Sequence, residues 1–430
     1  MKKVLIISYF FPPNNYTASN RAYSFAKYLK CFGFYPIIIT RNWDIIIQNT
    51  EDLSKPSGTS IKHQKFNNYE VYYLPFKGSI RDQFYSKFGS KFAFIRKVLS
   101  FFELILENFG LTFISHSNFY FKAKELLKTE DNLNHLIISS SPFNQFYYGF
   151  LLKKEFKKLK WIADYRDEWT SRTLISSNLI LDNFISFIQE KNEKRWLKSA
   201  DRIISVSDRV TKSISKHTGN KHFSIIENGF FEEDYHIKKQ KLHTNEFIIT
   251  YTGEIYTKQD FSIFFSAINK IILEFKDKVI IKIQFIGIAN NQSKKDYLLN
   301  LMKGVEDNLV FTKRVLRKKC VALEMQSNLL LMVVYGKLKG VPSSKLYQYI
   351  GSEKPVFICP SDKDIIEYYL SKTNQGIVAN NSKEAYDKLK NIINNFIINE
   401  NLNTKINKEE IKKFSRKHQA KKLAEILDSL

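Results

Sequence analysis

The N-terminal segment opens with an almost continuous apolar run at residues 3–11, which is typical of a parallel strand buried on both faces. After Pro12 and Pro13, apolar side chains recur along residues 22–29 at the spacing of one face of a helix. Gly33 then precedes a second apolar run at residues 36–40. This order predicts a right-handed βαβ unit, which commits the chain to an α/β fold with a parallel sheet.

The same rhythm returns along the chain, which at 430 residues is too long for one hydrophobic core. A polar, lysine-rich stretch at residues 232–246 separates two series of predicted strands. The first series continues at residues 135–139, 160–163, 202–206 and 224–226, and the second comprises residues 247–252, 279–287, 329–334 and 355–359. We therefore predict two Rossmann-like, doubly wound α/β domains joined by a linker near residue 240.

Motifs that would indicate several other chemistries are missing. The sequence has no GxGxxG in its first βα turn, no P-loop, no HExxH and no GxSxG. The cysteines, Cys31, Cys320 and Cys359, are far apart, so neither a zinc site nor a disulfide framework is indicated. The first apolar run is too short for a signal peptide, and no stretch is long enough to span a membrane. We expect a cytoplasmic protein without a metal or cofactor.

The formal net charge is +24, and such a surface attracts anions. The basic residues are spread along the whole chain and no nucleic-acid reading motif is visible, so we expect no nucleic-acid partner. Residues 77–124 interleave aromatic and basic side chains. Two interpretations of this segment stay open: amphipathic helices that cover the N-terminal sheet, or helices that lie on an anionic membrane.

Two polar segments follow buried strands. Ser343, Ser344 and Lys345 stand where a loop enters a helix, and the free N–H groups of a helix start can cradle a diphosphate. An ordinary serine-capped helix is the alternative. The segment at residues 161–169 places Asp164, Arg166 and Asp167 after a strand, where they would face a cleft or form a buried ion-pair network.

With these segments in place, the chain resembles glycosyltransferases of the GT-B fold, in particular the large retaining family 4 and its bacterial surface-polysaccharide members. The resemblance covers nearly the whole chain. It is carried by residues 9–13, 18–21, 163–169, 200–207, 226–230 and 251–254, and most specifically by 342–350 with 354–356. The last of these is similar to the family's donor-site helix and the strand that follows it.

The resemblance implies an acceptor-side domain at residues 1–235, a nucleotide-sugar donor domain at 246–410, and a helix at 411–430 that crosses back to the first domain. The domains would face a central cleft. It further implies transfer of a sugar, with retention of anomeric configuration, from a nucleoside-diphosphate donor, with uridine as the expected base. The acceptor would be a lipid-linked oligosaccharide in cell-surface polysaccharide synthesis.

The resemblance also assigns roles to residues. The expected catalytic residues are Asp164, Arg166 and Asp167; the donor-binding residues are Gly253, Lys258, Arg314, Ser343, Ser344, Lys345 and Gln348; the acceptor-side loop carries Ser19, Asn20 and Arg21. The chain departs from the family where two glutamates are common, because Gly340 and Gln348 occupy those positions. A non-catalytic homologue that binds an anionic membrane or polymer, and a nucleotide-sugar epimerase of the same fold, are the alternatives.

Overall fold

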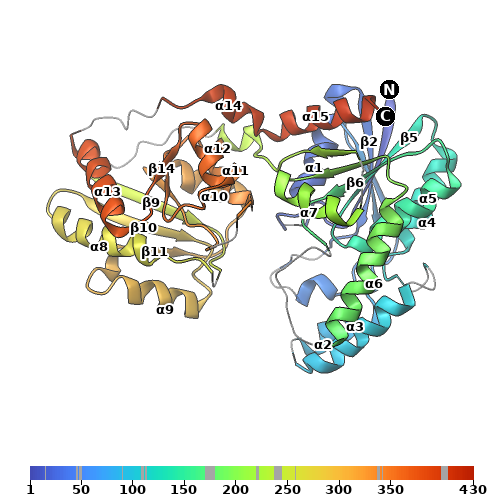
Figure 1. Ribbon diagram of the computed structural model, residues 1–430, viewed down its shortest axis with the longest axis horizontal. Coiled ribbons are helices and arrows are strands. Elements are labelled where there is room, and N and C mark those ends of the chain that lie inside the picture. Colours follow the sequence, from blue (N-terminus) through green and yellow to red (C-terminus); the bar gives the residue numbers. More distant parts are fainter. Residues whose placement is uncertain are drawn as a thin grey trace. The chain divides into compact units, whose positions relative to one another are not determined.

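The computed structural model describes residues 1–430 except 15, 45–46, 48–50, 90, 108–110, 112–113, 170–179, 219–221, 237–244, 257, 337–338, 341 and 399–404. The chain divides into two compact units (Figure 1). The first comprises residues 1–227 with 420–430, and the second comprises residues 228–419. The last helix, α15 (Arg416–Asp428), therefore lies mostly in the first unit although the chain reaches it from the second.

The first unit is built on an eight-stranded sheet of order β3-β4-β2-β1-β5-β6-β7-β8. All neighbouring strands pair in parallel except β3, an exposed edge strand that is antiparallel to β4. The strands are β1 (Lys2–Ser8), β2 (Phe34–Arg41), β3 (Lys62–Lys65), β4 (Glu70–Leu74), β5 (Leu133–Ser139), β6 (Lys160–Tyr165), β7 (Arg202–Ser205) and β8 (Phe223–Ile225).

Helices cover both faces of this sheet. Successive side chains of a strand point to opposite faces, so Leu5 of β1 packs in the core with α4 and α5, whereas Val4 packs in the core with α1 and α15. The helices are α1 (Ser19–Tyr28), α2 (Ile80–Phe88), α3 (Ala93–Glu107), α4 (Asn118–Thr129), α5 (Phe146–Glu155), α6 (Ile180–Leu197) and α7 (Asp208–Thr218), with short 3₁₀ turns η1 (Leu29–Phe32), η2 (Glu51–Ser54) and η4 (Phe143–Gln145).

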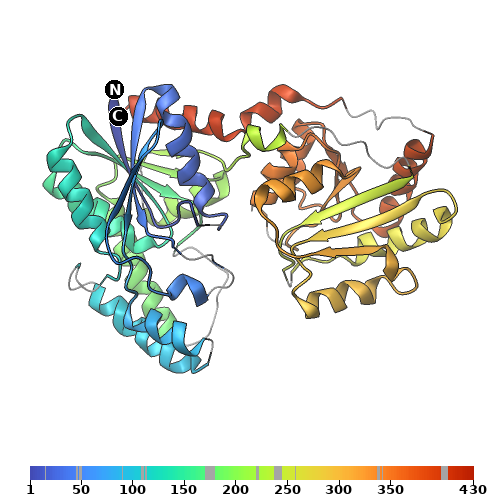
Figure 2. The ribbon, with the colours of Figure 1, turned by 180° about the vertical axis from the view of Figure 1, so that it is seen from behind.

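The second unit holds a six-stranded, fully parallel sheet of order β11-β10-β9-β12-β13-β14 (Figure 2). Leu331 of β12 packs in the core with α8 and α13, and Leu330 in the core with α11 and α12. The strands are β9 (Glu246–Thr252), β10 (Ile280–Ile286), β11 (Leu309–Thr312), β12 (Leu329–Met332), β13 (Val356–Ile358) and β14 (Gly376–Val378). The helices are α8 (Ser262–Phe275), α9 (Gln292–Leu301), α10 (Arg317–Met325), α11 (Ser344–Gly351), α12 (Ile365–Lys372), α13 (Ser382–Ile397) and α14 (Lys408–Lys413), with 3₁₀ turns η5 (Glu232–Tyr235) and η6 (Glu306–Asn308).

The prediction of two doubly wound, parallel-sheet units is confirmed. The first apolar run is longer than its strand, because β1 ends at Ser8, whose hydroxyl donates to the carbonyl oxygen of Phe10 at 2.9 Å. Tyr9 and Phe11 are buried as core residues beyond the strand end. Among the described residues, no helix has both the length and the apolar character that crossing a bilayer requires.

Candidate active site

In the first unit, two of the predicted site residues form a buried ion pair. The Arg21 Nε lies 3.0 and 2.9 Å from the two carboxylate oxygens of Asp164, and the Arg21 Nη2 lies 2.8 Å from one of them. The Ser139 hydroxyl donates to the same carboxylate at 2.8 Å. Asp164 is 0% and Arg21 2% exposed, so the pair joins α1 to the end of β6 and offers no open surface to a substrate.

Arg166, which directly follows β6, also links the end of this strand to the start of α1. Its Nη1 donates to the carbonyl oxygen of Ala18 at 3.0 Å, and its Nη2 lies 3.7 Å from the carboxylate of Asp167. Burial lowers the pKa of Arg166, and the negative charge of Asp167 opposes this shift. The Asp167 side chain is 58% exposed, so it can meet a ligand from solvent. The structure therefore brings the predicted acceptor-side loop and the carboxylate segment together.

The two remaining residues of the predicted acceptor-side loop lie at the start of α1. Ser19 is buried, and its hydroxyl donates to the side-chain oxygen of Asn14 at 3.1 Å. The same oxygen accepts from the backbone N–H of Tyr16 at 2.8 Å. Asn20 is partly exposed beside them. The side chain of Asn14 thus sets the shape of the turn that leads into α1.

A buried arginine at the carboxyl end of β2, Arg41, was not predicted from the sequence. The Arg41 guanidinium lies 4.1 Å from the ring centre of Trp43 and 4.0 Å from that of Phe76, and its Nη1 donates to the Tyr9 hydroxyl at 2.6 Å. Aromatic faces and hydrogen bonds together stabilise a cation that has no exposed surface. The sequence feature that could have indicated this site is an arginine directly after the apolar run at residues 36–40.

In the second unit, two predicted donor-site residues, Gly253 and Lys345, lie near the end of β9. Gly253 follows this strand with φ of +88°, a conformation that favours glycine. A Cβ at this position would lie 4.0 Å from the Cε of Lys345, and the Lys345 Nζ lies 3.3 Å from the ring centre of Tyr251. Burial lowers the pKa of Lys345 well below its usual range, and the charge of Glu324 opposes this effect. Lys345 is therefore an incompletely hydrated amine, and a bound anion would stabilise its charged form.

The start of α11 lies beside this lysine. Ser343 is the N-cap in an extended conformation, its side chain makes no capping hydrogen bond, and the first turn carries no acidic residue. The Ser343 side chain instead interacts with Tyr335. Ser344, the first residue of the helix, is exposed. The Leu346 N–H donates to the Ser343 carbonyl oxygen at 3.1 Å, but no side chain caps the helix start, so its positive dipole end is available for an anion.

The other two predicted donor residues lie in loops. Lys258 is exposed in the segment after β9, and its carbonyl oxygen lies 3.0 Å from the position that a Cβ on Gly336 would take. It therefore contacts the loop between β12 and α11. Arg314 is exposed in the loop between β11 and α10.

Gln348, on the first turns of α11, reaches a carboxylate on α10. Its side-chain nitrogen lies 3.0 and 2.9 Å from the two oxygens of Glu324, and 3.6 Å from the Cys320 sulfur. Glu324 is 0% exposed, and burial raises its pKa to about 7 although Thr252 and Gln348 hydrogen bonds oppose the shift. The amide is suited to this position because it donates to a carboxylate that a glutamate at position 348 would repel.

Sequence analysis did not single out Glu324. The visible signal was an acidic residue one turn after Cys320 on a short helix whose neighbouring positions are apolar. Tyr349 was also missed; its hydroxyl accepts from the backbone N–H of Thr252 at 3.0 Å and so attaches α11 to the end of β9. Among the residues that the structure describes, no group of three or more His, Cys, Asp and Glu could hold a metal ion.

Known proteins similar to this chain are found at the level of structure. No family model and no curated protein sequence matches the chain. Sucrose-phosphate synthase from Thermosynechococcus elongatus matches with a TM-score of 0.66 and 11% identity over 100% of this chain and 99% of that one. The UDP-forming α,α-trehalose-phosphate synthase from Burkholderia xenovorans, in complex with glucose-6-phosphate, gives 0.65 and 9% over 100% of both chains. WaaG, a glycosyltransferase involved in lipopolysaccharide biosynthesis, gives 0.53 and 11% over 98% and 95%.

These matches extend over both units, so the likeness concerns the whole architecture rather than one domain. The eight- and six-stranded sheets correspond to the two α/β domains of such enzymes. The chain therefore has the GT-B fold, as the sequence predicted.

Proposed function

We propose that this protein is a retaining glycosyltransferase of family 4 that transfers a sugar from a nucleoside-diphosphate donor, with uridine as the base. The observation that carries the proposal is the uncapped start of α11, where the Cε of Lys345 lies 4.0 Å from the position that a Cβ on the left-handed Gly253 would take. An anion such as a diphosphate suits that chemistry. One structural neighbour is a UDP-forming synthase, which supports the choice of base.

In this proposal the donor domain works mainly by stabilising the leaving group. Negative charge grows on the diphosphate as the bond to the sugar breaks, and the α11 N–H groups with Lys345 lie where they can balance it. Gln348 uses its amide nitrogen for Glu324, which leaves the amide oxygen to accept a hydrogen bond from a ribose hydroxyl. Lys258 and Arg314, which are exposed on loops, are the remaining residues that would bind the donor.

The acceptor side is assigned to the first unit, with Arg166 and Asp167 as its contacts to substrate. The buried pair of Arg21 and Asp164 would act beneath them by holding α1 against β6. We further propose a lipid-linked oligosaccharide acceptor in cell-surface polysaccharide synthesis; the structural neighbour WaaG is involved in lipopolysaccharide biosynthesis. Domain limits of 1–235, 246–410 and 411–430 belong to the same proposal.

A thermal-shift panel tests the donor assignment. The purified protein is heated with UDP, GDP, ADP and CMP and their common sugar conjugates. A ligand at about 100 times its dissociation constant stabilises the folded protein by about 2.7 kcal/mol, so binding is easily detected. We expect one nucleoside diphosphate, UDP, to raise the unfolding temperature in the native chain and in Lys383→Ala, an exposed control on α13, but not in Lys345→Ala.

Two results would contradict the proposal. If the protein unfolds cooperatively but no nucleotide changes its unfolding temperature, the proposed donor site is wrong. A shift that Lys345→Ala leaves unchanged would place the nucleotide elsewhere. Incubation of the stabilising donor with lipid-linked oligosaccharide, followed by NMR of the product's anomeric proton, then separates transfer with retention from binding alone.

A further inference from the structure

The helices α2, α3 and α6 expose an unusual number of large apolar side chains. Phe94 of α3 is 78% exposed and Phe102 56%, Ile80 at the start of α2 is 76% exposed, and Phe184 and Phe187 of α6 are 48% and 54% exposed. The ring of Phe101 on α3 lies 6.0 Å from that of Phe184, which joins α3 to α6. Both ribbon views show α6 running beside this helical pair (Figures 1 and 2). We call these exposed residues the apolar face.

Within segment 77–107, the exposed charges that accompany the apolar face are of one sign. Among the described residues of segment 77–107, the exposed charged side chains are Lys77, Lys87, Lys91 and Lys97. The acidic residues of the same segment are Asp82, which is buried, and Glu103 and Glu107, which are partly buried and bonded to the protein. The segment therefore presents aromatic side chains and positive charge together to the solvent.

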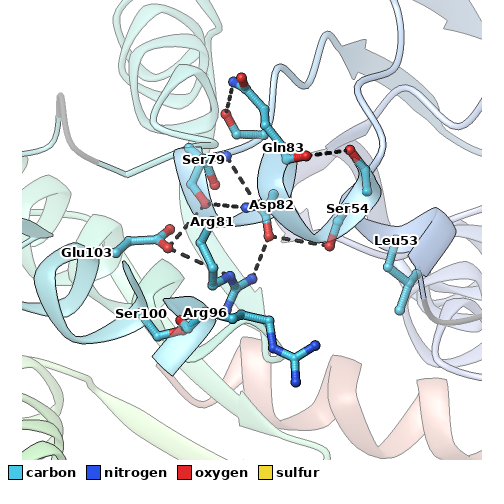
Figure 3. Close-up of polar contacts among 12 residues, drawn as sticks. Leu53, Ser54, Ser79, Arg81, Asp82, Gln83, Arg96, Ser100 and Glu103 are labelled. Carbon is cyan, nitrogen blue, oxygen red and sulfur yellow. Dashed lines mark hydrogen bonds and ion pairs between the residues drawn. The ribbon is translucent and has the colours of Figure 1, made fainter. Parts of the chain in front are cut away.

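A polar network on the inner side fixes which face points outward (Figure 3). Ser79 and Asp82 form a capping box at the start of α2, each bonding the other's backbone N–H at 3.1 Å. Arg81 connects Asp82, at 2.5 Å, with Glu103 of α3, at 3.8 Å. The Ser54 hydroxyl of η2 donates to Asp82 at 3.4 Å. These polar contacts hold both helices to the unit, and Ile80, Phe94 and Phe102 are left exposed to solvent.

We propose that the apolar face docks the protein on the surface of an anionic lipid membrane. A helix pair of this kind lies in the headgroup region with its aromatic residues inserted and its lysines beside the lipid phosphates. Exposed apolar surface of this extent marks an interaction site. The inference needs neither a donor nor an acceptor and stands apart from the proposed sugar transfer.

The same charges argue against a second copy of the chain as the occupant. In a two-fold symmetric dimer each surface patch meets itself, so Lys87, Lys91 and Lys97 of one copy would approach those of the other. Like charges brought together across an interface disfavour it. An anionic membrane instead complements every exposed charge of the segment.

Vesicle co-sedimentation with the full chain tests the proposal. Phosphatidylcholine vesicles with and without phosphatidylglycerol are compared, at low and at high salt. We expect binding to the anionic vesicles that salt weakens, and little binding to the neutral ones. Phe94→Ser with Phe102→Ser should reduce the affinity at least tenfold, whereas Leu273→Ser with Leu316→Ser, side chains of the second unit that are 60% and 79% exposed, should not.

The lysines are tested in the same way. Lys87→Gln, Lys91→Gln and Lys97→Gln together should lower the affinity by about two orders of magnitude, since each basic residue near a membrane contributes about fivefold. Lys318→Gln with Lys319→Gln, exposed residues of α10, is the control. All these side chains are exposed, so circular dichroism should confirm unchanged folding.

Three outcomes would overturn the inference. One is failure of the native chain to bind anionic vesicles. Another is equal loss of binding in the apolar-face and control variants, which would mean that the general positive charge acts alone. The third is a dimer in sedimentation equilibrium that the Phe94→Ser, Phe102→Ser variant dissociates, which would assign the face to a second copy.

Discussion

The side-chain nitrogen of Gln348 lies within 3.0 Å of both carboxylate oxygens of Glu324. A buried carboxylate is stabilised when a donor faces it, and an amide is the donor here. Gln348 therefore supplies the buried Glu324 of α10 with a hydrogen-bond donor that a glutamate at position 348 would lack.

Gln348→Glu should destabilise the second unit by about 2–4 kcal/mol at neutral pH, because it places two carboxylates in contact inside the protein. Calorimetric unfolding of the full chain measures the change. The exchanged variant, Glu324→Gln with Gln348→Glu, keeps one donor and one carboxylate and should recover most of the stability. Equal instability of the single and the exchanged variants would contradict this account.

Nucleotide binding should take up a proton at Lys345. Burial lowers the pKa of the free amine, and a bound diphosphate would favour its charged form, so the pKa rises on binding. Affinity for the donor should therefore increase as the pH is lowered through the range where the free lysine is neutral. Titration calorimetry in buffers of different ionisation enthalpy counts the protons, and Lys345→Arg, whose guanidinium is always charged, should bind the nucleotide without the uptake. Uptake that persists in this variant would assign it to another group.

Arg21→Met should destabilise the first unit by about 3–5 kcal/mol, because it leaves the Asp164 carboxylate buried without its partner. Arg21→Met combined with Asp164→Leu replaces both charges by apolar groups and should be more stable than either single variant. Unfolding temperatures of the four proteins form a double-mutant cycle. Additive effects of the two substitutions would show that the pair is not coupled.

Glu107 should make the first unit less stable as the pH rises. Burial raises the pKa of this carboxyl to about 7, although the Asn144 side chain, which donates to it at 2.9 Å, opposes the shift. Between the unfolded value of about 4.3 and this value, the folded state keeps a proton that the unfolded chain has lost, so stability falls across this window.

Glu107→Gln keeps an acceptor for Asn144 and removes the titration. It should stabilise the protein by about 1–3 kcal/mol at ~pH 8 and by almost nothing at ~pH 4. Thermal unfolding at a series of pH values gives the comparison. A constant difference between the two proteins at every pH would show that Glu107 does not titrate in this window.

Much of the fold was predictable because its signals are local. Parallel strands buried on both faces need continuous apolar runs, and the runs at residues 36–40 and 247–252 became β2 and β9. The start of α11 was visible for the same reason, since Ser343 ends a loop and apolar helical spacing follows it. The edge strand β3 was missed because its residues, KHQK, are polar and exposed.

The partners of the site residues depend on contacts between distant segments. Arg21 and Asp164 are 143 positions apart, and Glu324 and Gln348 are 24 apart, so no local pattern links them. Likewise, the mixture of aromatic and basic residues at 77–124 left two interpretations open in the sequence. Whether Phe94 and Phe102 are buried or exposed depends on which side of α3 is held against the rest of the unit, and Arg81, Asp82 and Glu103 set that side only once the chain has folded.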